Sequence, residues 1–131
     1  MPPFPLTGMT RMPLIQVPLR DGEPPIRGVI RLALAMAQLL PSHYQVGAVT
    51  KELREYIGRV APDVAEAARR RGDGDPACVR VLADVEEAQR RARHGSAGDG
   101  YLSAIRYAVG LAESAEALLR HQEGVVDGGD G

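Results

Sequence analysis

Residues 101–119 read YLSAIRYAVGLAESAEALL, and this stretch decides the fold because its apolar residues recur every three or four positions. That spacing places one apolar stripe along one side of a helix, as helices that pack on each other require. The stripe consists of Tyr101, Ile105, Ala108, Ala112, Ala115 and Leu119. Alanine predominates in it, and small side chains let helix axes approach closely. We therefore expect a large neighbouring helix against this face.

Three further stretches carry the same spacing. They are Ile26-Val29-Ala33-Met36-Leu40, Val46-Val49-Leu53-Tyr56-Val60 and Cys78-Val81-Val85-Ala88-Ala92. Four helices joined by short links pack as antiparallel neighbours. The sequence therefore predicts an all-α fold, a four-helix up-down-up-down bundle over residues 25–123. The proline-rich residues 1–24 are expected to form an extended or disordered arm, and residues 124–131 a disordered Gly/Asp tail.

Proline, glycine and capping residues predict the helix boundaries. We expect the first helix to run from Pro25 to just before Pro41, and the third to begin at Asp75-Pro76, an N-cap carboxylate followed by a first-turn proline. The third helix should end near residue 93. The fourth should start after a cap at Asp99 and stop at Gly124. The links at 41–45 and 94–100 then lie at the same end of the bundle.

The second helix, from about residue 46 to 71, contains Pro62. A proline ring clashes with the carbonyl four residues earlier, which here belongs to Gly58. We expect a kink or a short break near Val60.

Composition excludes several classes of protein. The 131 residues fit one domain, and the net charge of −1 supplies no field that favours nucleic acid. The start lacks the regions of a signal peptide, and Arg31 interrupts the longest apolar run, so no membrane segment is expected. A single cysteine, Cys78, argues for a reducing compartment. We expect a cytoplasmic protein.

Two basic clusters, Arg69–Arg71 and Arg90–Arg93, leave open the alternative of a nucleic-acid-binding regulator. However, glutamates occur four positions before many arginines, a spacing that favours ion pairs on a solvated helix surface. The pairs are Glu55–Arg59, Glu66–Arg70, Glu86–Arg90, Glu87–Arg91 and Glu116–Arg120. Nucleic acid is therefore not the expected partner.

No arrangement of residues indicates a catalytic centre. The chain lacks Glu-x-x-His, His-Glu-x-x-His, a phosphate-binding loop after a strand and Gly-x-Ser-x-Gly. We expect no cofactor and no metal, and the sequence leans away from an enzyme. The alternative is a small ligand-binding or enzymatic bundle that uses the polar residues gathered at one end. These residues are His43, Tyr44, His94, Asp99 and Tyr101.

The first helix is apolar well beyond its stripe, so it is either central in the bundle or it supplies a second contact surface. The second alternative predicts a protein partner or self-association, for example as a homodimer. The interface would include Arg27, Arg31, Leu32, Leu34, Ala35 and Leu39.

The order of helices also carries a resemblance. A Leu/Val helix reaches a proline between Leu53 and Pro62, VEEAQRR follows at 85–91, and the last helix contains Leu111-Ala112-Glu113 and Leu118-Leu119-Arg120-His121. Residues 26–123 resemble a family of small uncharacterised actinobacterial helical proteins labelled "natural product biosynthesis protein". The resemblance implies bacterial specialised metabolism and transfers no catalytic residue. We expect a non-enzymatic interaction, accessory or regulatory module.

Overall fold

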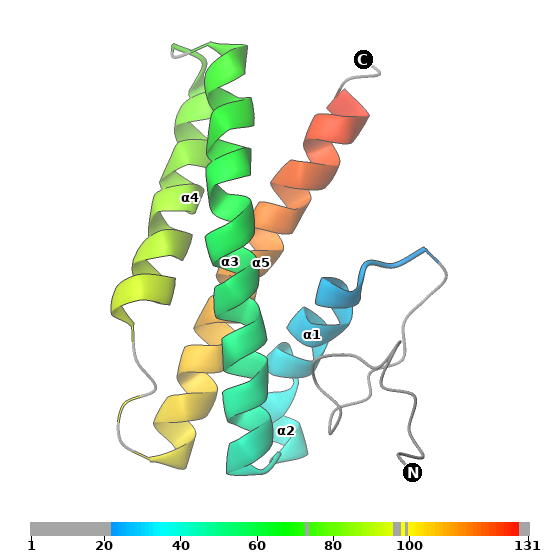
Figure 1. Ribbon diagram of the computed structural model, residues 1–131, viewed down its shortest axis with the longest axis vertical. Coiled ribbons are helices and arrows are strands. Elements are labelled where there is room, and N and C mark those ends of the chain that lie inside the picture. Colours follow the sequence, from blue (N-terminus) through cyan, green and yellow to red (C-terminus); the bar gives the residue numbers. More distant parts are fainter. Residues whose placement is uncertain (1–21, 73, 96–97, 99, 129–131) are drawn as a thin grey trace, which may run out of the picture.

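The computed structural model describes residues 22–72, 74–95, 98 and 100–128, and it is helical throughout its regular parts (Figure 1). The helices of this part of the chain are α1 (Pro25–Leu34), α2 (Met36–Leu39), α3 (His43–Arg71), α4 (Pro76–His94) and α5 (Tyr101–Gly128). The all-α prediction is confirmed. The chain reverses direction between α2 and α3, between α3 and α4 and between α4 and α5 (Figure 1). Helices α3, α4 and α5 pack on one another, and α1 packs on α3 and α5.

The prediction of one first helix up to Pro41 is wrong, because the chain leaves the helix at Ala35 and forms α2 as a separate turn. Leu40 then ends α2 in the left-handed conformation, with φ 49° and ψ 58°. That conformation costs an L-residue roughly 1–2 kcal/mol, and a following proline disfavours it further. Pro41 cannot continue a helix, so the turn at Leu40 takes the chain directly to the start of α3.

Helix α3 begins at His43, three residues earlier than predicted, because Ser42 and Gln45 form a capping box. The Gln45 N–H donates to Ser42 Oγ over 3.1 Å, and the Ser42 N–H donates to Gln45 Oε1 over 2.9 Å. The helix then continues through Pro62, so of the two predicted outcomes near Val60, a kink or a short break, the break is absent. Buried residues on both sides of the proline, including Val60 and Val64, hold the two halves to one core.

The predicted start of α4 is confirmed: Asp75 Oδ1 accepts the Ala77 N–H over 2.9 Å and Pro76 occupies the first turn. The predicted end of the last helix is wrong, because α5 passes through Gly124 and continues to Gly128. Residues 124–128 of the predicted tail therefore belong to α5, and its last three residues are 129–131. Those residues, the arm up to residue 21 and the expected cap Asp99 lie outside the described residues.

The core lies where α3 and α5 cross, and α1 and α4 cover it from either side. Its largest fully buried side chains include Leu53 and Ile57 of α3 and Leu111 and Leu118 of α5. The three alanines of the α5 stripe, Ala108, Ala112 and Ala115, are completely buried. Helix α1 contributes Ile30 and Ala33 to the core but contacts only two of the three long helices within the described part, so it is not central.

Arg91 links α4 to α5. One of its terminal nitrogens donates to the Gly110 carbonyl over 2.7 Å and to Ser114 Oγ over 3.1 Å, and the other lies 2.9 Å from Glu87. The backbone carbonyl of Arg91 also accepts the Tyr107 hydroxyl over 2.9 Å. Arg91 therefore fastens the two helices through both its side chain and its main chain.

Tyr56 joins α3 to α5 through a hydrogen bond from its hydroxyl to Gln122 Oε1, 2.7 Å long. Burial raises the pKa of Tyr56 to about 12, although the positive charge of Arg59 nearby acts to lower it. An unfolded tyrosine titrates near pH 10, at about its ordinary pKa. The folded state therefore binds this proton more tightly than the unfolded state does.

This difference predicts that stability falls as the pH rises from about 10 to about 12, because only the unfolded chain loses the Tyr56 proton readily in that window. Urea unfolding at several alkaline pH values measures the loss. Tyr56→Phe should lack this part of the pH dependence, whereas Tyr44→Phe, a change at an exposed tyrosine, should retain it. Equal pH dependence in wild type and Tyr56→Phe would contradict the prediction.

Candidate interaction surface and basic groove

The structure brings together two of the five residues predicted to form a ligand site. The His43 and Tyr101 rings meet edge to face, with centroids 5.0 Å apart, and the Tyr101 hydroxyl donates to the Pro41 carbonyl. His94 is exposed at the end of α4, and Asp99 lies outside the described residues. Tyr44 is exposed and borders a hollow along α3. The His43–Tyr101 contact thus joins the start of α3 to the start of α5.

Large apolar side chains are exposed at this same end, where α2 ends and where α3 and α5 begin. Leu39 is 57% exposed, Leu40 68%, Tyr44 65% and Leu102 63%. We call these four residues the apolar end surface. Leu34, on α1, is a further exposed leucine at 39%. At the opposite end Val79, 58% exposed near the start of α4, is a comparable side chain outside this group.

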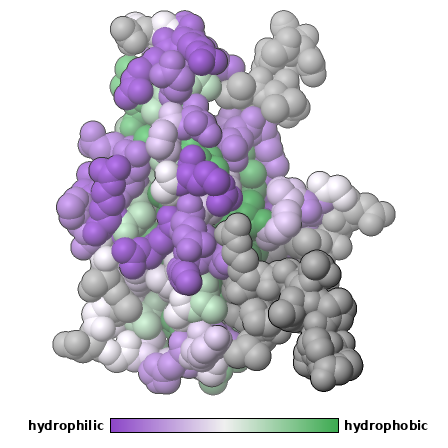
Figure 2. All heavy atoms as spheres, viewed as in Figure 1, coloured by the Kyte–Doolittle hydropathy of each residue, from purple (hydrophilic) through white to green (hydrophobic). Residues whose placement is uncertain are grey.

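The apolar end surface is built mostly from an uncharged stretch of the sequence. Residues 32–50 contain no Asp, Glu, Lys or Arg, although charged residues make up 25% of the chain. Figure 2 shows the contrast: hydrophilic side chains dominate the upper and middle parts of the face, and the lower end is paler. Large exposed apolar patches are rare on soluble proteins and mark contact sites.

The residues of the predicted partner interface differ in their surroundings: the arginines form ion pairs within the chain, and only some of the apolar residues are exposed. Arg27 donates to both carboxylate oxygens of Glu123 on α5, over 2.9 and 3.0 Å, and Arg31 pairs with Glu23 over 2.9 Å. Both arginines thus bind carboxylates of their own chain. Leu32 and Ala35 are half-buried, and Leu34 and Leu39 are exposed.

Sequence reasoning missed Leu40 and Leu102 as surface residues. Leu40 lies on the apolar stripe and was expected inside, but its left-handed backbone turns it outward. The uncharged stretch 32–50 was the signal that could have located this surface.

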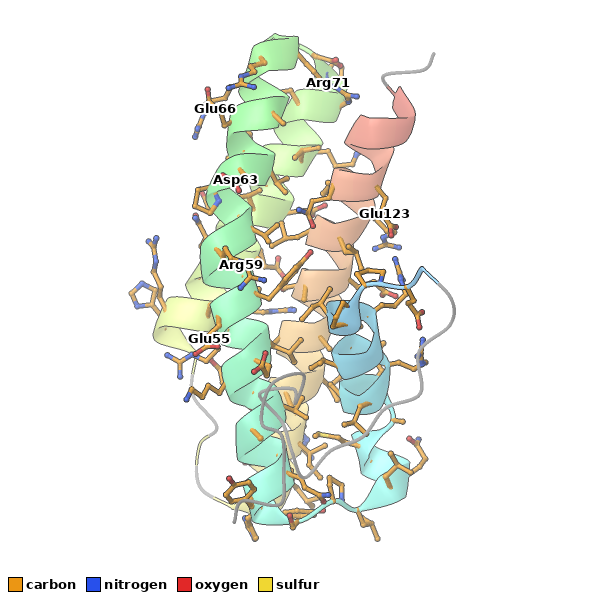
Figure 3. The ribbon with its side chains drawn as sticks, turned by 45° about the vertical axis from the view of Figure 1, so that its right-hand side comes forward. Glu55, Arg59, Asp63, Glu66, Arg71 and Glu123 are labelled. Atoms are coloured by element: carbon orange, nitrogen blue, oxygen red, sulfur yellow. The ribbon has the colours of Figure 1, made fainter. Side chains whose placement is uncertain are left out.

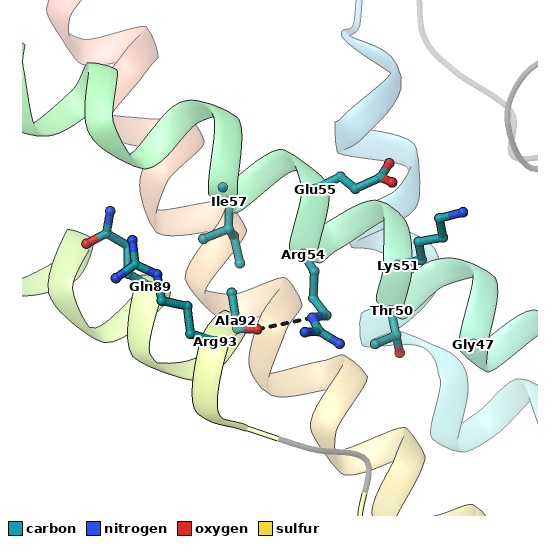
Figure 4. A pocket seen from close by; sticks show the side chains of 10 residues that line it. Gly47, Thr50, Lys51, Arg54, Glu55, Ile57, Gln89, Ala92 and Arg93 are labelled. Atoms are coloured by element: carbon teal, nitrogen blue, oxygen red, sulfur yellow. Dashed lines mark hydrogen bonds between the residues drawn. The ribbon is translucent and has the colours of Figure 1, made fainter.

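A second feature is a groove between α3 and α4 with a volume of about 460 Å³ (Figure 4). Two buried side chains of its lining, Ile57 and Ala92, are apolar. Its cationic residues are Lys51, Arg54 and Arg93. The Arg54 Nε–H donates to the Ala92 carbonyl near the end of α4, over 3.1 Å (Figure 4).

The basic clusters are partly explained by glutamate partners. Three of the expected pairs form: Glu66–Arg70 at 3.7 Å, Glu86–Arg90 at 3.8 Å and Glu87–Arg91 at 2.9 Å. Along α3, Glu55, Arg59, Asp63 and Glu66 follow one another on the outer surface (Figure 3). This surface has charges of both signs, which does not favour binding to a phosphate backbone.

Two findings limit other kinds of site in the described part of the chain. No three side chains of the His, Cys, Asp and Glu types come together there in a way that could hold a metal ion. None of the described helices is both long enough and apolar enough to cross a membrane.

Comparison with known proteins identifies a family. No curated protein matches the chain, and no solved structure does. A family model described as "Family of unknown function (DUF6415)" matches residues 25–125, which extend from the first residue of α1 into the last turns of α5. The chain therefore belongs to the DUF6415 family.

Proposed function

We propose that this protein is a non-enzymatic helical interaction module that binds a protein partner through its apolar end surface. The observation that carries the proposal is the exposure of Leu39, Leu40, Tyr44 and Leu102 at one end of the molecule, the first three of them within the uncharged stretch 32–50. Burying such side chains on a partner contributes roughly 25 cal/mol per Å² of apolar area. The chemistry that fits is an apolar helix face or groove of the partner, without charges that would lose their solvation.

The conformation of Leu40 supports the proposal. A left-handed residue at the end of a helix is usually glycine, because glycine adopts this conformation without steric cost. Here a leucine occupies the position and exposes its side chain. Strained residues cluster at functional sites, and an exposed leucine gains nothing for the fold that would offset the strain. A role in contact with a partner explains why the side chain is present.

We extend the proposal to the arrangement of the helices and to the protein's cellular role. We propose a four-helix up-and-down arrangement in which α1 and α2 together take the first place. The single cysteine and the resemblance to actinobacterial proteins support a cytoplasmic accessory or regulatory factor in specialised metabolism. The ligand-binding alternative has weaker support, since His43 and Tyr101 bind within the chain.

The test uses photo-crosslinking residues placed at Leu102 and, as the matched control, at Val79. Both positions hold exposed apolar side chains near the start of a helix, but they lie at opposite ends of the molecule. In the native host, a crosslinker at position 102 should capture a partner or a second copy that one at position 79 does not. Capture of the same proteins from both positions would contradict the proposal.

Substitutions then measure how much the residues of the apolar end surface contribute to the affinity for the captured partner. Leu39→Ser and Leu102→Ser should each weaken binding of the captured partner by about tenfold, or about 1.4 kcal/mol, while Val79→Ser leaves it unchanged. Leu40→Gly should weaken binding similarly and yet preserve or raise stability, because glycine relieves the left-handed strain. If the partner binds all four variants equally well, the apolar end surface is not the binding site. Sedimentation equilibrium distinguishes a second copy from a different protein.

A further inference from the structure

A link of two residues joins α1 and α2 to the other described helices. The link consists of Leu40 and Pro41, because α2 ends at Leu39 and the capping box fixes Ser42 at the start of α3. The pyrrolidine ring holds φ of Pro41 at about −65°. The backbone conformation of Leu40 therefore decides the direction in which α1 and α2 leave α3.

This link is strained in the observed conformation. Leu40 has φ 49° and ψ 58°, and among the described residues it is the one residue other than glycine with a positive φ. An L-residue adopts the left-handed region at a steric cost, and a residue that precedes a proline favours extended backbone. A change of Leu40 to extended backbone relieves this cost. The same change moves α1 and α2 away from the α3 and α5 of their own chain.

Contacts beyond the link hold it in the strained form. Helix α1 buries Ile30 and Ala33, and α2 buries Met36. Among the described helices, α1 packs on α3 and α5, whereas α2 packs on α1 and α5 but not on α3. The Tyr101 hydroxyl at the start of α5 donates to the Pro41 carbonyl within the link itself. A second copy of the chain offers the same α3 and α5 surfaces to α1 and α2.

We infer that two copies of this chain exchange α1 and α2, so that each copy lays these helices on the α3 and α5 of the other. The packing of α1 and α2 and the Arg27–Glu123 ion pair are then made between the copies and favour neither form. Relief of two strained links favours the dimer, and the freedom lost on association opposes it. The dimer is therefore expected at high protein concentration.

The position of the link suits such an exchange. It lies within the uncharged stretch 32–50, so two copies that meet at this end bring no like charges of that stretch together. This inference goes beyond the proposed function, because the exchanged contacts are made by the buried side of α1. They do not involve the exposed side chains of the apolar end surface.

The first test shows on which copy α1 lies. Arg27→Cys and Glu123→Cys are combined with Cys78→Ala, and a short bis-maleimide joins the two introduced thiols wherever α1 lies on α5. The protein is kept at high concentration in urea just below its unfolding transition and then diluted, and size exclusion separates the dimer. Crosslinking of this dimer should give covalent dimers on a denaturing gel, because position 27 of one copy lies beside position 123 of the other. Each single-cysteine variant is a control and should run as a monomer.

Two results of this test would overturn the exchange. One is a protein that remains monomeric after the urea treatment. The other is a dimer in which the crosslinks join positions 27 and 123 of the same chain. Such a dimer would be held side by side, and it would leave the apolar end surface as its contact.

Variants of the link then test whether strain drives the exchange. Leu40→Gly adopts the left-handed conformation freely, so it should lower the association constant of the dimer by about a hundredfold, tenfold for each link. Leu40→Ser is the matched control, because it removes the same apolar side chain but keeps the strain, and it should dimerise as the wild type does. Tyr101→Phe removes a bond that holds the link closed and should raise the constant by about fivefold.

Sedimentation equilibrium after the same urea treatment measures these constants. If Leu40→Gly and Leu40→Ser lower the association constant equally, the leucine side chain and not the strain stabilises the dimer, and the inference fails. Equal constants for the wild type and Leu40→Gly would overturn it as well.

Discussion

Arg91→Ala is expected to lower the free energy of unfolding by about 2–3 kcal/mol. This is one of the two largest losses of stability that we predict for a single substitution. The change removes the hydrogen bonds to the Gly110 carbonyl and to Ser114 Oγ, the ion pair with Glu87 and the packing of a half-buried side chain. Ser114 is buried, so its hydroxyl would lose the charged donor without gaining free access to water. Urea denaturation measures the difference.

Arg90→Ala is the matched control, because it changes the neighbouring arginine of the same helix. Arg90 is exposed and pairs with Glu86 only at 3.8 Å, so its removal should alter stability by less than about 0.5 kcal/mol. Arg91→Lys keeps the charge but not the planar fork of donors. Its loss of unfolding free energy should lie between those of Arg90→Ala and Arg91→Ala. Equal effects of Arg90→Ala and Arg91→Ala would show that Arg91 does not hold α4 to α5.

Gly95→Ala is expected to cost about 2 kcal/mol, a result of steric overlap and not of backbone conformation. Gly95 has φ −74° and ψ 157°, which alanine adopts freely. A Cβ there would lie 2.6 Å from the Arg91 carbonyl oxygen and 2.6 Å from Cε1 of Tyr107. Relief requires the Tyr107 ring to move, and that movement breaks its hydrogen bond to the same carbonyl.

The control for Gly95→Ala is Gly58→Ala, which should have the opposite sign. A Cβ at Gly58 meets nothing within 4 Å, so alanine should stabilise the exposed helix by about 0.5–1 kcal/mol. Thermal unfolding of the two variants, followed by circular dichroism, gives the comparison. A stabilising Gly95→Ala would mean that the α4–α5 connection is more open than the structure shows.

The sequence predicted the parts of the fold that depend on periodicity and capping. The apolar stripes located α3, α4 and α5, and Asp75-Pro76 located the start of α4, because these signals are local. Its errors include two helix-breaking residues that the structure places inside continuous helices. Pro62 does not break α3 because buried residues on both sides secure it, and Gly124 does not end α5.

The candidate sites were harder to predict for a related reason. Whether Leu40 faces inward or outward depends on a left-handed turn, and no residue near it signals such a turn as glycine would. The groove combines Arg54 with Arg93, which are distant in sequence and adjacent only when α3 and α4 pack. His43 and Tyr101 were correctly placed at one end, but the Pro41 carbonyl that binds Tyr101 leaves no periodic signal.

The link between Arg27 and Glu123 has a consequence for how the protein forms during synthesis. The two residues are 96 positions apart, and the inner side of α1, with Ile30 and Ala33, packs on α5 and α3. At about 5–20 residues per second, a ribosome needs roughly 5–20 s to make the chain between them. Throughout that interval α1 has no completed surface to dock on. Helix α1, made before the other described helices, is therefore among the last of them to be secured, and its apolar side must wait for α5.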